Sequence, residues 1–526
     1  MASLRPTSYA SRSRAAVARY VPSVVLPTSR SRSSGFGLDD NTISGVNPRF
    51  VVVGAGMAGL LSAIKLREAG FTDITVYEKA DRLGGTWREN TYPGIACDVP
   101  SHLYTYSFAP NPDWSRAFSP GAEILGYLEA VANRHGVAGL IRYGTEVRRL
   151  EYDGSRWRIE LSTGQRDEAD VVIAATGVLH HQRYPDIDGL DEFTGPLFHS
   201  ARWDHDAPLA GARLGVIGTG SSAVQITGAL VDVVGELHLF QRTPQWVLAV
   251  DNPPISDDDR ARYRADPTAL VGLRDELNAN FVQGFANAVV DAESPALRML
   301  QELGRANLEE HVADPDLREK LRPHYRAGCK RLIISPNFYD AIQRPNARLV
   351  TERIDRVEAG GVRTVDGLLH ELDVLVLATG FRVDRFLRPI EVVGRGGVRL
   401  DDLWTPRPYA YLSVSMPGFP NLFMLNGPNG PVGNFSLIDV AEAQFGYLIQ
   451  LIDLLRRDVC RSVCASAEAT DRYEAQRVEA AKNTVWVTGC RSWYLDDRGI
   501  PAAWPWSFSR FQEAMARPEP ADYELA

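Results

Sequence analysis

Short apolar runs and longer amphipathic stretches alternate along most of the chain, which is the pattern of strands and helices in an α/β protein. Residues 49–54 form a short buried-strand run, apolar positions at helical spacing follow over residues 60–66, and a second strand run spans residues 74–78. The same order of strand, glycine-rich turn, helix and strand begins again at Leu214. The pattern therefore predicts an α/β fold with two Rossmann-like dinucleotide-binding domains.

Two further apolar runs, residues 169–178 and 372–381, read as strands that both end in Ala-Thr-Gly. Such strands return the chain to one nucleotide domain or close another, and the glycine lets the backbone approach a cofactor. A chain of 526 residues is also too long for one ordinary core. We predict a first domain of residues 45–182 and 383–526, an inserted second domain of residues 183–382, and a helical subdomain at about 250–330.

The first glycine-rich turn, residues 54–59, follows the pattern G-x-G-x-x-G. Gly54 makes the tight turn, Gly56 lets the backbone approach a pyrophosphate, and Gly59 lets the helix pack on the strand. The helix N-terminus places a positive dipole end at the phosphates. The next strand ends in Glu78, which lies 19 residues after Gly59 and would hold two ribose hydroxyls while excluding a 2′-phosphate. The first site is therefore expected to bind the adenosine half of FAD.

The second glycine-rich turn starts at Gly218 and reads G-x-G-x-x-A, with Gly220 in the middle and Ala223 in the last place. The strand after it, residues 236–240, runs into Arg242 and Thr243 and not into an acid. A guanidinium and a hydroxyl at this place would bind a 2′-phosphate, so we predict NADPH as the second cofactor. The alternative is that Arg242 is an ordinary surface charge.

Composition places the chain among globular proteins, with 44% hydrophobic and 23% charged residues. The longest apolar runs are far shorter than the roughly 20 residues that span a bilayer, so we expect a soluble protein. The net charge is −9, and no basic stretch interleaved with aromatic residues favours nucleic acid as a partner. No metal site is expected.

The first 38 residues have a composition of their own, with six arginines, nine serines and no acidic residue. This resembles a mitochondrial or plastid transit peptide. The alternative is a disordered extension or a mistaken start codon on a cytoplasmic protein. We expect residues 1–44 to be a disordered or targeting extension.

The cysteines are scattered and odd in number, which argues against a disulfide framework. They are Cys97, Cys329, Cys460, Cys464 and Cys490. Cys460 and Cys464 are expected on one face of a helix. No closely spaced cysteine pair lies beside either glycine turn, so a dithiol relay of the disulfide-reductase kind is not expected.

Residues 193–204 follow the pattern F-x-G-x-x-x-H-x-x-x-W-D and lie between the two glycine turns. They resemble the signature of the type I Baeyer–Villiger monooxygenases. The flavin monooxygenases that oxidise nitrogen and sulfur usually end this motif in Tyr or Phe without the acid, whereas here it ends in Trp203 and Asp204. Residues 84–98 match a second pattern of the Baeyer–Villiger family, G-G-x-W-x4-Y-P-G-x3-D, at every fixed position.

The resemblance implies particular roles for residues that the local pattern leaves unassigned. Asp98 would lie near the reacting flavin ring and orient a catalytic arginine, Arg331, while Lys330 would bind the 2′-phosphate. His199 is not expected to act as an acid or base. Further cofactor contacts are expected at Ala58, Thr86, Trp87, Tyr104, Val147, Thr219, Ser221, Ser222, Gln225 and Leu437.

The resemblance also implies a reaction. NADPH would reduce FAD, the reduced flavin would capture O₂ as a C4a-peroxide, and attack on a ketone would give an ester or lactone. Arg331, a permanent cation, would stabilise the negative oxygens. The glycine-rich stretch 427–437 is expected to form a mobile wall over the ketone.

Two other functions stay open at this point. One is a flavin monooxygenase that oxidises sulfur or nitrogen centres. The other is an NADPH-binding flavoprotein oxidase or sensor without oxygenation. The sequence makes no prediction of the oligomeric state.

Overall fold

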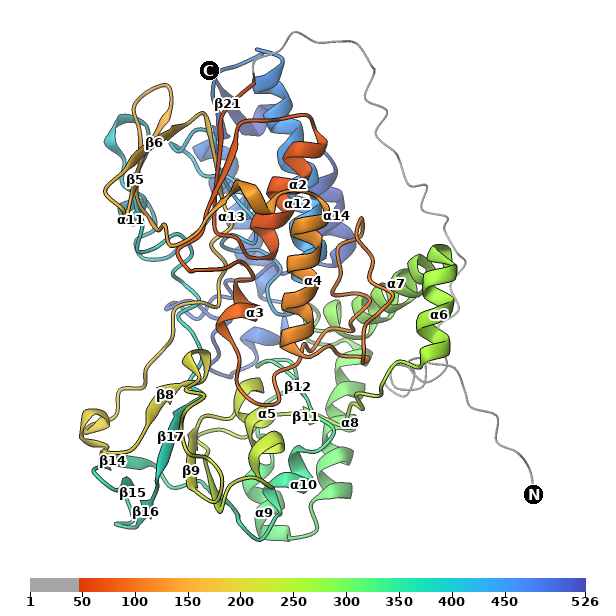
Figure 1. Ribbon diagram of the computed structural model, residues 1–526, viewed down its shortest axis with the longest axis vertical. Coiled ribbons are helices and arrows are strands. Elements are labelled where there is room, and N and C mark those ends of the chain that lie inside the picture. Colours follow the sequence, from red (N-terminus) through yellow and green to blue (C-terminus); the bar gives the residue numbers. More distant parts are fainter. Residues whose placement is uncertain (1–46) are drawn as a thin grey trace.

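The computed structural model describes residues 47–526, so the predicted extension of residues 1–44 lies outside the described part. Figure 1 shows an upper lobe around helices α2 and α12, a lower lobe around strands β9 and β17, and helices α6 and α7 at one side. Each of the two lobes contains a five-stranded parallel sheet. The predicted α/β class with two nucleotide-type sheets is confirmed.

The sheet of the upper lobe has the strand order β19-β7-β1-β2-β3, with every neighbouring pair parallel. Its strands are β19 (Leu422–Met424), β7 (Val171–Ala174), β1 (Phe50–Val53), β2 (Ile74–Tyr77) and β3 (Ile141–Arg142). Strands β1 and β7 consist only of buried apolar residues, as expected for strands covered on both faces. The helices of this lobe are α2 (Met57–Glu68), α3 (Thr86–Glu89), α4 (Gly121–Arg134), α12 (Leu437–Arg456), α13 (Ala467–Ala481) and α14 (Phe508–Ala516).

The sheet of the lower lobe has the order β13-β10-β9-β17-β8 and is parallel throughout. Its strands are β13 (Ala347–Val350), β10 (Glu236–Phe240), β9 (Arg213–Ile217), β17 (Val374–Leu377) and β8 (Leu197–His199). Helices α5 (Ser221–Leu230) and α10 (Phe338–Ile342) pack in this lobe. The chain enters the lower lobe after β7 and returns to the upper lobe after β17, so one nucleotide unit is inserted into the other.

The remaining strands of residues 47–526 form smaller sheets. The order β18-β4-β5-β6 joins β18 (Glu391–Val393), β4 (Val147–Tyr152), β5 (Trp157–Leu161) and β6 (Arg166–Ala169). The order β14-β15-β16 joins β14 (Ile354–Glu358), β15 (Gly361–Thr364) and β16 (Leu369–Glu371). Two-stranded pairs are β11 (Val247–Leu248) with β12 (Ile333–Ile334), and β20 (Val463–Ala465) with β21 (Tyr523–Leu525). Helix α11 (Leu400–Leu403) packs beside β18.

The stretch predicted to be helical at about 250–330 contains four α-helices. They are α6 (Asp257–Ala265), α7 (Pro267–Phe281), α8 (Pro295–His311) and α9 (Pro315–Leu321), with a π-helical turn over Val282–Ala286. Three of these helices begin with proline, whose fixed φ suits the first turn. Among the described helices, none is long and apolar enough to cross a membrane.

The structure corrects two expectations about cysteine. Helix α12 ends at Arg456, and Asp458 adopts φ 56°, a left-handed backbone that stops the helix before Cys460. Cys464 instead lies in strand β20, so these two cysteines do not share a helix face. Cys329 and Cys490 form a disulfide across 161 residues, which their scattered positions did not indicate.

Candidate functional site

The first glycine-rich turn is as tight as its sequence predicts. Gly54 has φ 102°, and a Cβ there would lie 2.7 Å from the carbonyl oxygen of Ala175. A Cβ on Gly59 would lie 1.8 Å from the carbonyl oxygen of Gly54, so helix α2 can follow β1 this closely only with glycine. Gly56 is less crowded, with the Cα of Gly85 at 3.5 Å from a built Cβ. Two glycine-rich segments therefore meet at the start of α2, where Ala58 is also buried.

Glu78 lies directly after β2 and is buried. Its carboxylate accepts hydrogen bonds from the backbone N–H groups of Ala55 at 2.8 Å and Ala80 at 3.0 Å. Arg88 of α3 approaches the same carboxylate at 3.1 Å. A carboxylate offers about four acceptor positions, and three are engaged within the protein. The role of Glu78 toward ribose hydroxyls stays a prediction.

Two of the residues predicted to line the flavin, Trp87 and Tyr104, are in contact at helix α3. Helix α3 begins at Thr86, and the indole N–H of Trp87 donates to the hydroxyl of Tyr104 at 3.3 Å. The two rings meet edge to face at 5.6 Å. Burial, with smaller contributions from Cys97 and Asp98, raises the pKa of Tyr104, so its phenol stays neutral. Asp98 is therefore a close neighbour of this aromatic pair.

Asp98 and Arg331 form an ion pair between the two halves of the predicted site. Nε and Nη2 of Arg331 donate to the same oxygen, Oδ2 of Asp98, at 3.0 and 2.5 Å. Nη1 donates to the carbonyl oxygen of Gly433 at 2.7 Å, and the phenol of Tyr494 is a further neighbour. Burial opposes the charge of Arg331, but attraction to Asp98 outweighs it and raises the pKa. Each side chain of the Arg331–Asp98 pair keeps 27% exposure, so both remain accessible to a ligand.

The second glycine-rich turn is open where a ligand would need room. Gly218 has φ 125°, and a Cβ there would lie 2.3 Å from the carbonyl oxygen of Ala378. A Cβ on Gly220 would meet no atom within 4 Å among the described residues. Helix α5 starts at the next residue, Ser221. The turn is fastened to the predicted phosphate-binding segment, because the hydroxyl of Thr219 donates to the carbonyl of Thr243 at 2.9 Å.

Two cations lie near each other beside this turn. Burial lowers the pKa of Lys330, and repulsion from Arg242 lowers it further, so the two charges are neighbours. The ammonium of Lys330 also lies 5.2 Å from the ring centre of Tyr325. Neither Arg242 nor Lys330 forms an ion pair with any residue between 47 and 526. Two adjacent cations without a carboxylate partner favour an anion such as a 2′-phosphate.

Ser222 and Gln225, two of the predicted cofactor contacts on α5, face the upper lobe. The hydroxyl of Ser222 and the side-chain oxygen of Gln225 both bond the phenol of Tyr92, at 3.2 and 2.8 Å. The amide nitrogen of Gln225 donates to the carbonyl of Ala96 at 3.0 Å. Gln225 therefore joins the two nucleotide units within the protein, and its contact with a cofactor stays a prediction.

The signature segment 193–204 is fastened to the end of strand β17. Nδ1 of His199 accepts from the backbone N–H of Ala201 at 3.1 Å, and Nε2 lies 3.0 Å from the carbonyl oxygen of Gly380. These contacts require a neutral ring protonated at Nε2, and burial also lowers the pKa of His199. Both ring nitrogens are thus engaged in holding the backbone. Trp203 packs edge to face against Phe198 at 5.1 Å.

The predicted contacts Val147 and Leu437 begin elements of the upper lobe. Val147 is the buried first residue of β4, and Leu437 is the first residue of α12. Just before Leu437, the amide of Asn434 and the hydroxyl of Ser436 are buried without a hydrogen-bond partner among the described residues. Buried polar groups are normally paired, so these orphaned atoms indicate a place for a polar ligand.

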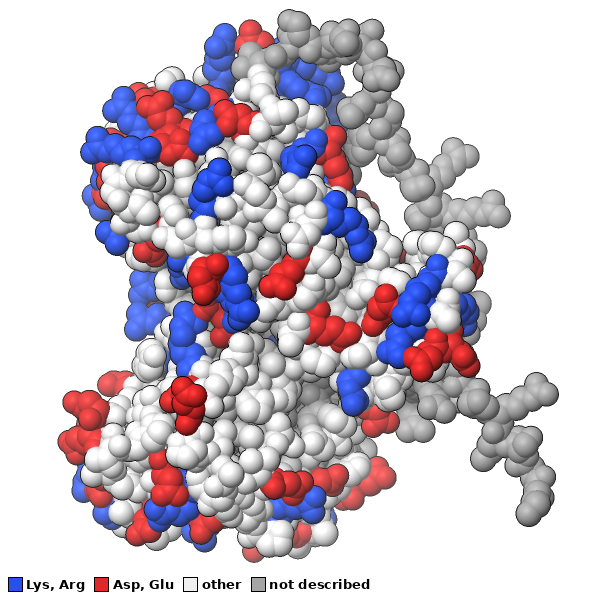
Figure 2. Space-filling view, in the orientation of Figure 1, with Lys and Arg blue, Asp and Glu red and all other residues white. Residues whose placement is uncertain are grey.

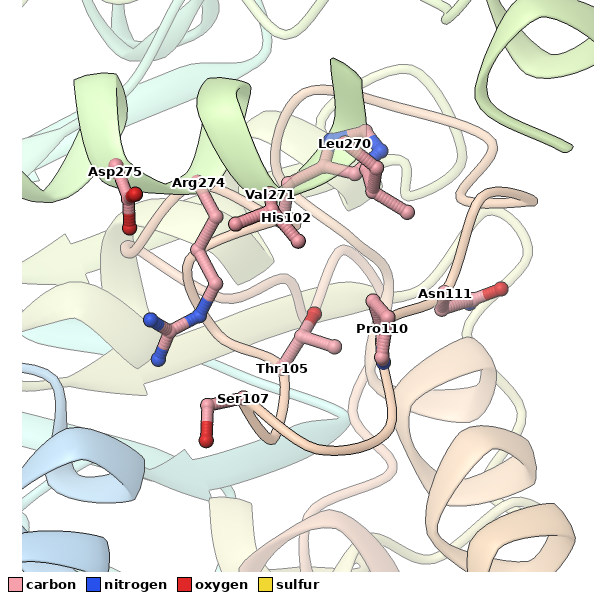
Figure 3. A pocket seen from close by; sticks show the side chains of 9 residues that line it. All are labelled: His102, Thr105, Ser107, Pro110, Asn111, Leu270, Val271, Arg274 and Asp275. Atoms are coloured by element: carbon pink, nitrogen blue, oxygen red, sulfur yellow. The ribbon is translucent and has the colours of Figure 1, made fainter. Parts of the chain in front are cut away.

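A cavity of about 150 Å³ lies between α7 and residues 102–111 (Figure 3). Figure 3 shows the guanidinium of Arg274 pointing toward Ser107. Arg274 also forms a buried ion pair with Asp439 of α12, and the neighbouring Glu442 accepts from the backbone N–H of Ser107 at 2.8 Å. Burial raises the pKa of Asp439 to about 7 and also raises the pKa of Glu442. The positive charge of Arg274 therefore acts on two buried carboxyl groups, as an ion-pair partner of Asp439 and as a neighbour of Glu442.

Sequence reasoning missed Gly433, Asn434 and Tyr494. Gly433 and Asn434 fell inside a stretch predicted only as a mobile wall, and no periodic pattern marks Tyr494.

On the face drawn in Figure 2, Lys and Arg side chains are mixed with Asp and Glu. No group of three or more His, Cys, Asp or Glu residues suited to a metal ion occurs within residues 47–526.

The chain is similar to several known proteins over most of its length. The model of the NAD(P)-binding Rossmann-like domain matches residues 52–119. An uncharacterized monooxygenase of Mycobacterium tuberculosis is 47% identical, covering 92% of this chain and 97% of the relative. A Baeyer-Villiger monooxygenase of Streptomyces coelicolor is 41% identical, covering 91% and 92%. The crystal structure of cyclohexanone monooxygenase from Rhodococcus sp. Phi1 bound to NADP+ superposes with a TM-score of 0.81 at 31% identity, covering 92% and 99%.

Proposed function

The chain belongs to the type I Baeyer–Villiger monooxygenases, and we propose that Arg331, oriented by Asp98, is its catalytic arginine. Its cofactors are FAD and NADPH, and it inserts one oxygen atom of O₂ next to a ketone carbonyl to give an ester or a lactone. The single observation that carries the proposal is the contact of Arg331 with Asp98. It joins residues from the two nucleotide units, and both side chains remain partly exposed to a ligand.

The residues around the first glycine turn fit FAD. The glycine backbone at Gly56 and the N-terminus of α2 suit a pyrophosphate, and the unpaired polar atoms of Asn434 and Ser436 suit the polar part of a flavin. Further residues that would hold it are Gly54, Gly59, Thr86, Trp87 and Tyr104. When bound, FAD accepts a hydride from NADPH and in its reduced form reacts with O₂.

Arg331 contributes a cation that never loses its proton and forked donors of fixed geometry. Asp98 holds the guanidinium through two N–H groups and offsets its charge, which lowers the cost of placing a cation between two domains. The guanidinium would stabilise negative charge that develops on oxygen while a carbonyl is attacked. Asp98 is in this reading a positioning residue for Arg331.

Arg242 and Lys330 would select NADPH. Their side chains are close neighbours and have no carboxylate partner within the described residues, so a dianionic 2′-phosphate would relieve their repulsion. Thr219 and Thr243, which are joined by a hydrogen bond, would hold the turn in place beside the phosphate. NADH lacks this phosphate and would gain nothing from the two cations.

The test of the function uses the purified holoenzyme with a cyclic ketone and, in parallel, a thioether of similar size. The expected result is a product heavier by one oxygen atom from the ketone, formed with consumption of one NADPH. Sulfoxide as the only product would favour the sulfur-oxidising alternative. Hydrogen peroxide equal to the NADPH consumed, with no oxygenated product, would favour an oxidase.

A further inference from the structure

Tyr494 is a buried residue that contacts the proposed catalytic arginine and that no sequence pattern marked. Its phenol lies next to Gly433, whose carbonyl binds Arg331, and interacts with that arginine, and only 3% of the residue is exposed. The ring stacks on Trp486 with ring centres 5.2 Å apart and lies against Trp493 at 4.0 Å. The orientation of the phenol toward Arg331 is therefore set by aromatic packing on two sides.

Gly433 makes the approach of Tyr494 possible. It has φ 90°, and a Cβ there would lie 2.3 Å from the hydroxyl oxygen of Tyr494 and 2.8 Å from its Cε1. Any side chain at this position would displace the phenol. The carbonyl oxygen of Gly433 accepts from Nη1 of Arg331 at 2.7 Å, so Gly433 and Tyr494 bind the same guanidinium.

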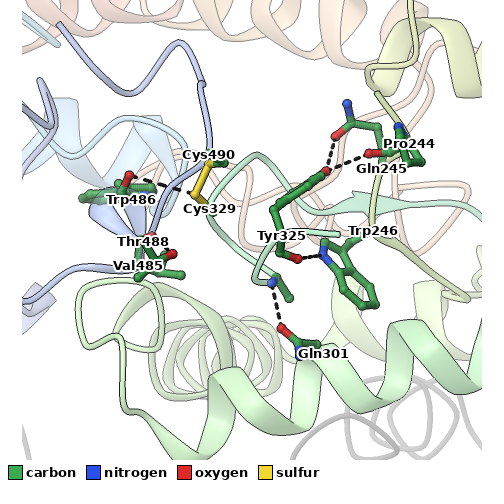
Figure 4. The surroundings of a disulfide bond; sticks show 11 residues. Pro244, Gln245, Trp246, Gln301, Tyr325, Cys329, Val485, Trp486, Thr488 and Cys490 are labelled. Carbon is green, nitrogen blue, oxygen red and sulfur yellow. Dashed lines mark hydrogen bonds between the residues drawn. A yellow bond between two sulfur atoms is a disulfide. The ribbon is translucent and has the colours of Figure 1, made fainter. Parts of the chain in front are cut away.

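A disulfide holds the two segments together. Cys329 lies two residues before Arg331, and Cys490 lies four residues before Tyr494, with a Cα–Cα distance of 6.2 Å (Figure 4). Both cysteines are buried. The segment before Cys490 is also held by its backbone, because the N–H of Val485 donates to the carbonyl of Val289 at 3.1 Å. The backbones that carry Arg331 and Tyr494 are thus fixed near each other independently of their side chains.

The donors of Arg331 can be counted. A guanidinium has five N–H groups and no acceptor. Two donate to Asp98 and one to Gly433, so two remain, and the phenol of Tyr494 lies next to the same guanidinium. Since a neutral phenol adds no charge, Tyr494 fixes the guanidinium without cancelling the cation, unlike a second carboxylate.

We propose that Tyr494 is a positioning residue that, together with Gly433, aims the remaining N–H groups of Arg331 at the reacting oxygen. The inference rests on the proposed role of Arg331. Without Tyr494, the guanidinium keeps its hydrogen bonds to Asp98 and Gly433 but loses the neighbour that limits small shifts of the whole group. Negative oxygen would then be stabilised less well, and more of the reduced cofactor would be spent on hydrogen peroxide.

The test is Tyr494→Phe in the holoenzyme, which keeps the stacked ring and removes only the hydroxyl. NADPH-driven bleaching of the flavin should proceed within about twofold of the wild-type rate, because the reducing step does not use this hydroxyl. Ester formation should fall by about tenfold, the lower end for losing one hydrogen bond to a charged group. Hydrogen peroxide should account for the difference. Tyr473→Phe is the matched control, a buried tyrosine whose hydroxyl has no partner among the described residues.

A second readout does not depend on turnover. Thermal unfolding is measured for the wild type, Tyr494→Phe, Arg331→Ala and the double variant. If the two side chains are bonded, the shifts in midpoint are not additive, because once Arg331 is absent the loss of the Tyr494 hydroxyl removes no contact. Additive shifts would contradict the contact on which the inference rests.

The outcomes separate this inference from the proposed function. Normal ester formation by Arg331→Ala overturns the proposed function. Loss of ester with Arg331→Ala but wild-type ester and peroxide yields with Tyr494→Phe overturns only the role of Tyr494. If Tyr494→Phe does not fold, Gly433→Ala is used instead. The added methyl group pushes the phenol away from Arg331 although Tyr494 itself is unchanged, and the same rise in peroxide is expected. An unchanged peroxide yield in that variant would count against the inference.

Discussion

Asp98 and Arg331 are 233 residues apart in the chain and meet through two hydrogen bonds to one carboxylate oxygen. Asp98 follows the first glycine turn of the upper lobe, while Arg331 precedes β12 in the inserted segment. The pair therefore exists only when the two units are docked. Replacing either side chain should therefore disturb the pair.

Replacing Arg331 with alanine is expected to separate the two halves of the catalytic cycle. Flavin reduction by NADPH should continue, whereas ester formation should fall by a factor on the order of 10²–10³, the usual cost of losing one preorganised donor to a developing oxyanion. Rapid mixing followed by product analysis measures both steps. Arg331→Lys, which keeps the charge but not the fork, should recover only part of the activity. A normal ester yield from Arg331→Ala would refute the assignment.

Removing Arg242 or Lys330 is expected to weaken NADPH and to leave NADH unaffected. Each single alanine variant should raise the KM for NADPH by about tenfold or more, the cost of a lost hydrogen bond to a charged group. Steady-state kinetics with both nucleotides measures the split. Arg305→Ala, at a half-exposed arginine of α8 that pairs with Glu302, is the matched control. An equal loss for NADH would show that these residues do not read the 2′-phosphate.

Gly220→Ala should fold normally and lose affinity for NADPH. A Cβ at Gly220 meets no atom of the described protein within 4 Å, so the methyl group would conflict only with a bound pyrophosphate. Nucleotide titration and a melting curve together measure the effect. Gly446→Ala, where a Cβ in helix α12 also meets nothing within 4 Å, is the control and should keep its nucleotide affinity. Unchanged NADPH binding by Gly220→Ala would place the pyrophosphate elsewhere.

Asp439 is expected to make stability depend on pH. Burial, and repulsion from Glu442 and Asp275 beyond what Arg274 offsets, raises its folded pKa to about 7 from an unfolded value of about 3.9. The folded protein therefore binds this proton more tightly. The contribution to stability is complete below about pH 4 and is lost as pH rises through about 7, with a slope of up to about 1.4 kcal/mol per pH unit.

The measurement compares the free energy of unfolding of the wild type and Asp439→Asn from pH 4 to pH 8. The difference between them should change with pH across this window, since the variant has no proton to release. Asp257→Asn, at a side chain that is 93% exposed, is the control. A difference that stays constant with pH would mean that Asp439 is ionised in the folded protein throughout.

The amino-acid sequence by itself determined the two nucleotide-type units, because strand, glycine turn and helix depend on neighbours in the chain. The crowding at Gly54 and Gly59 agrees with the roles their spacing predicted. Local pattern could not say that Gln225 would bond Ala96 and not point away, nor that the helix before Cys460 would stop at Arg456.

Only the tertiary structure decided which distant segments meet. The contacts of Arg331 with Gly433 and Tyr494, and the bond between Cys329 and Cys490, join segments separated by more than 100 residues. Such contacts follow from how whole domains pack, and packing depends on shape and volume summed over many side chains. No periodicity near either partner records them, so the geometry around the arginine had to be read from the fold.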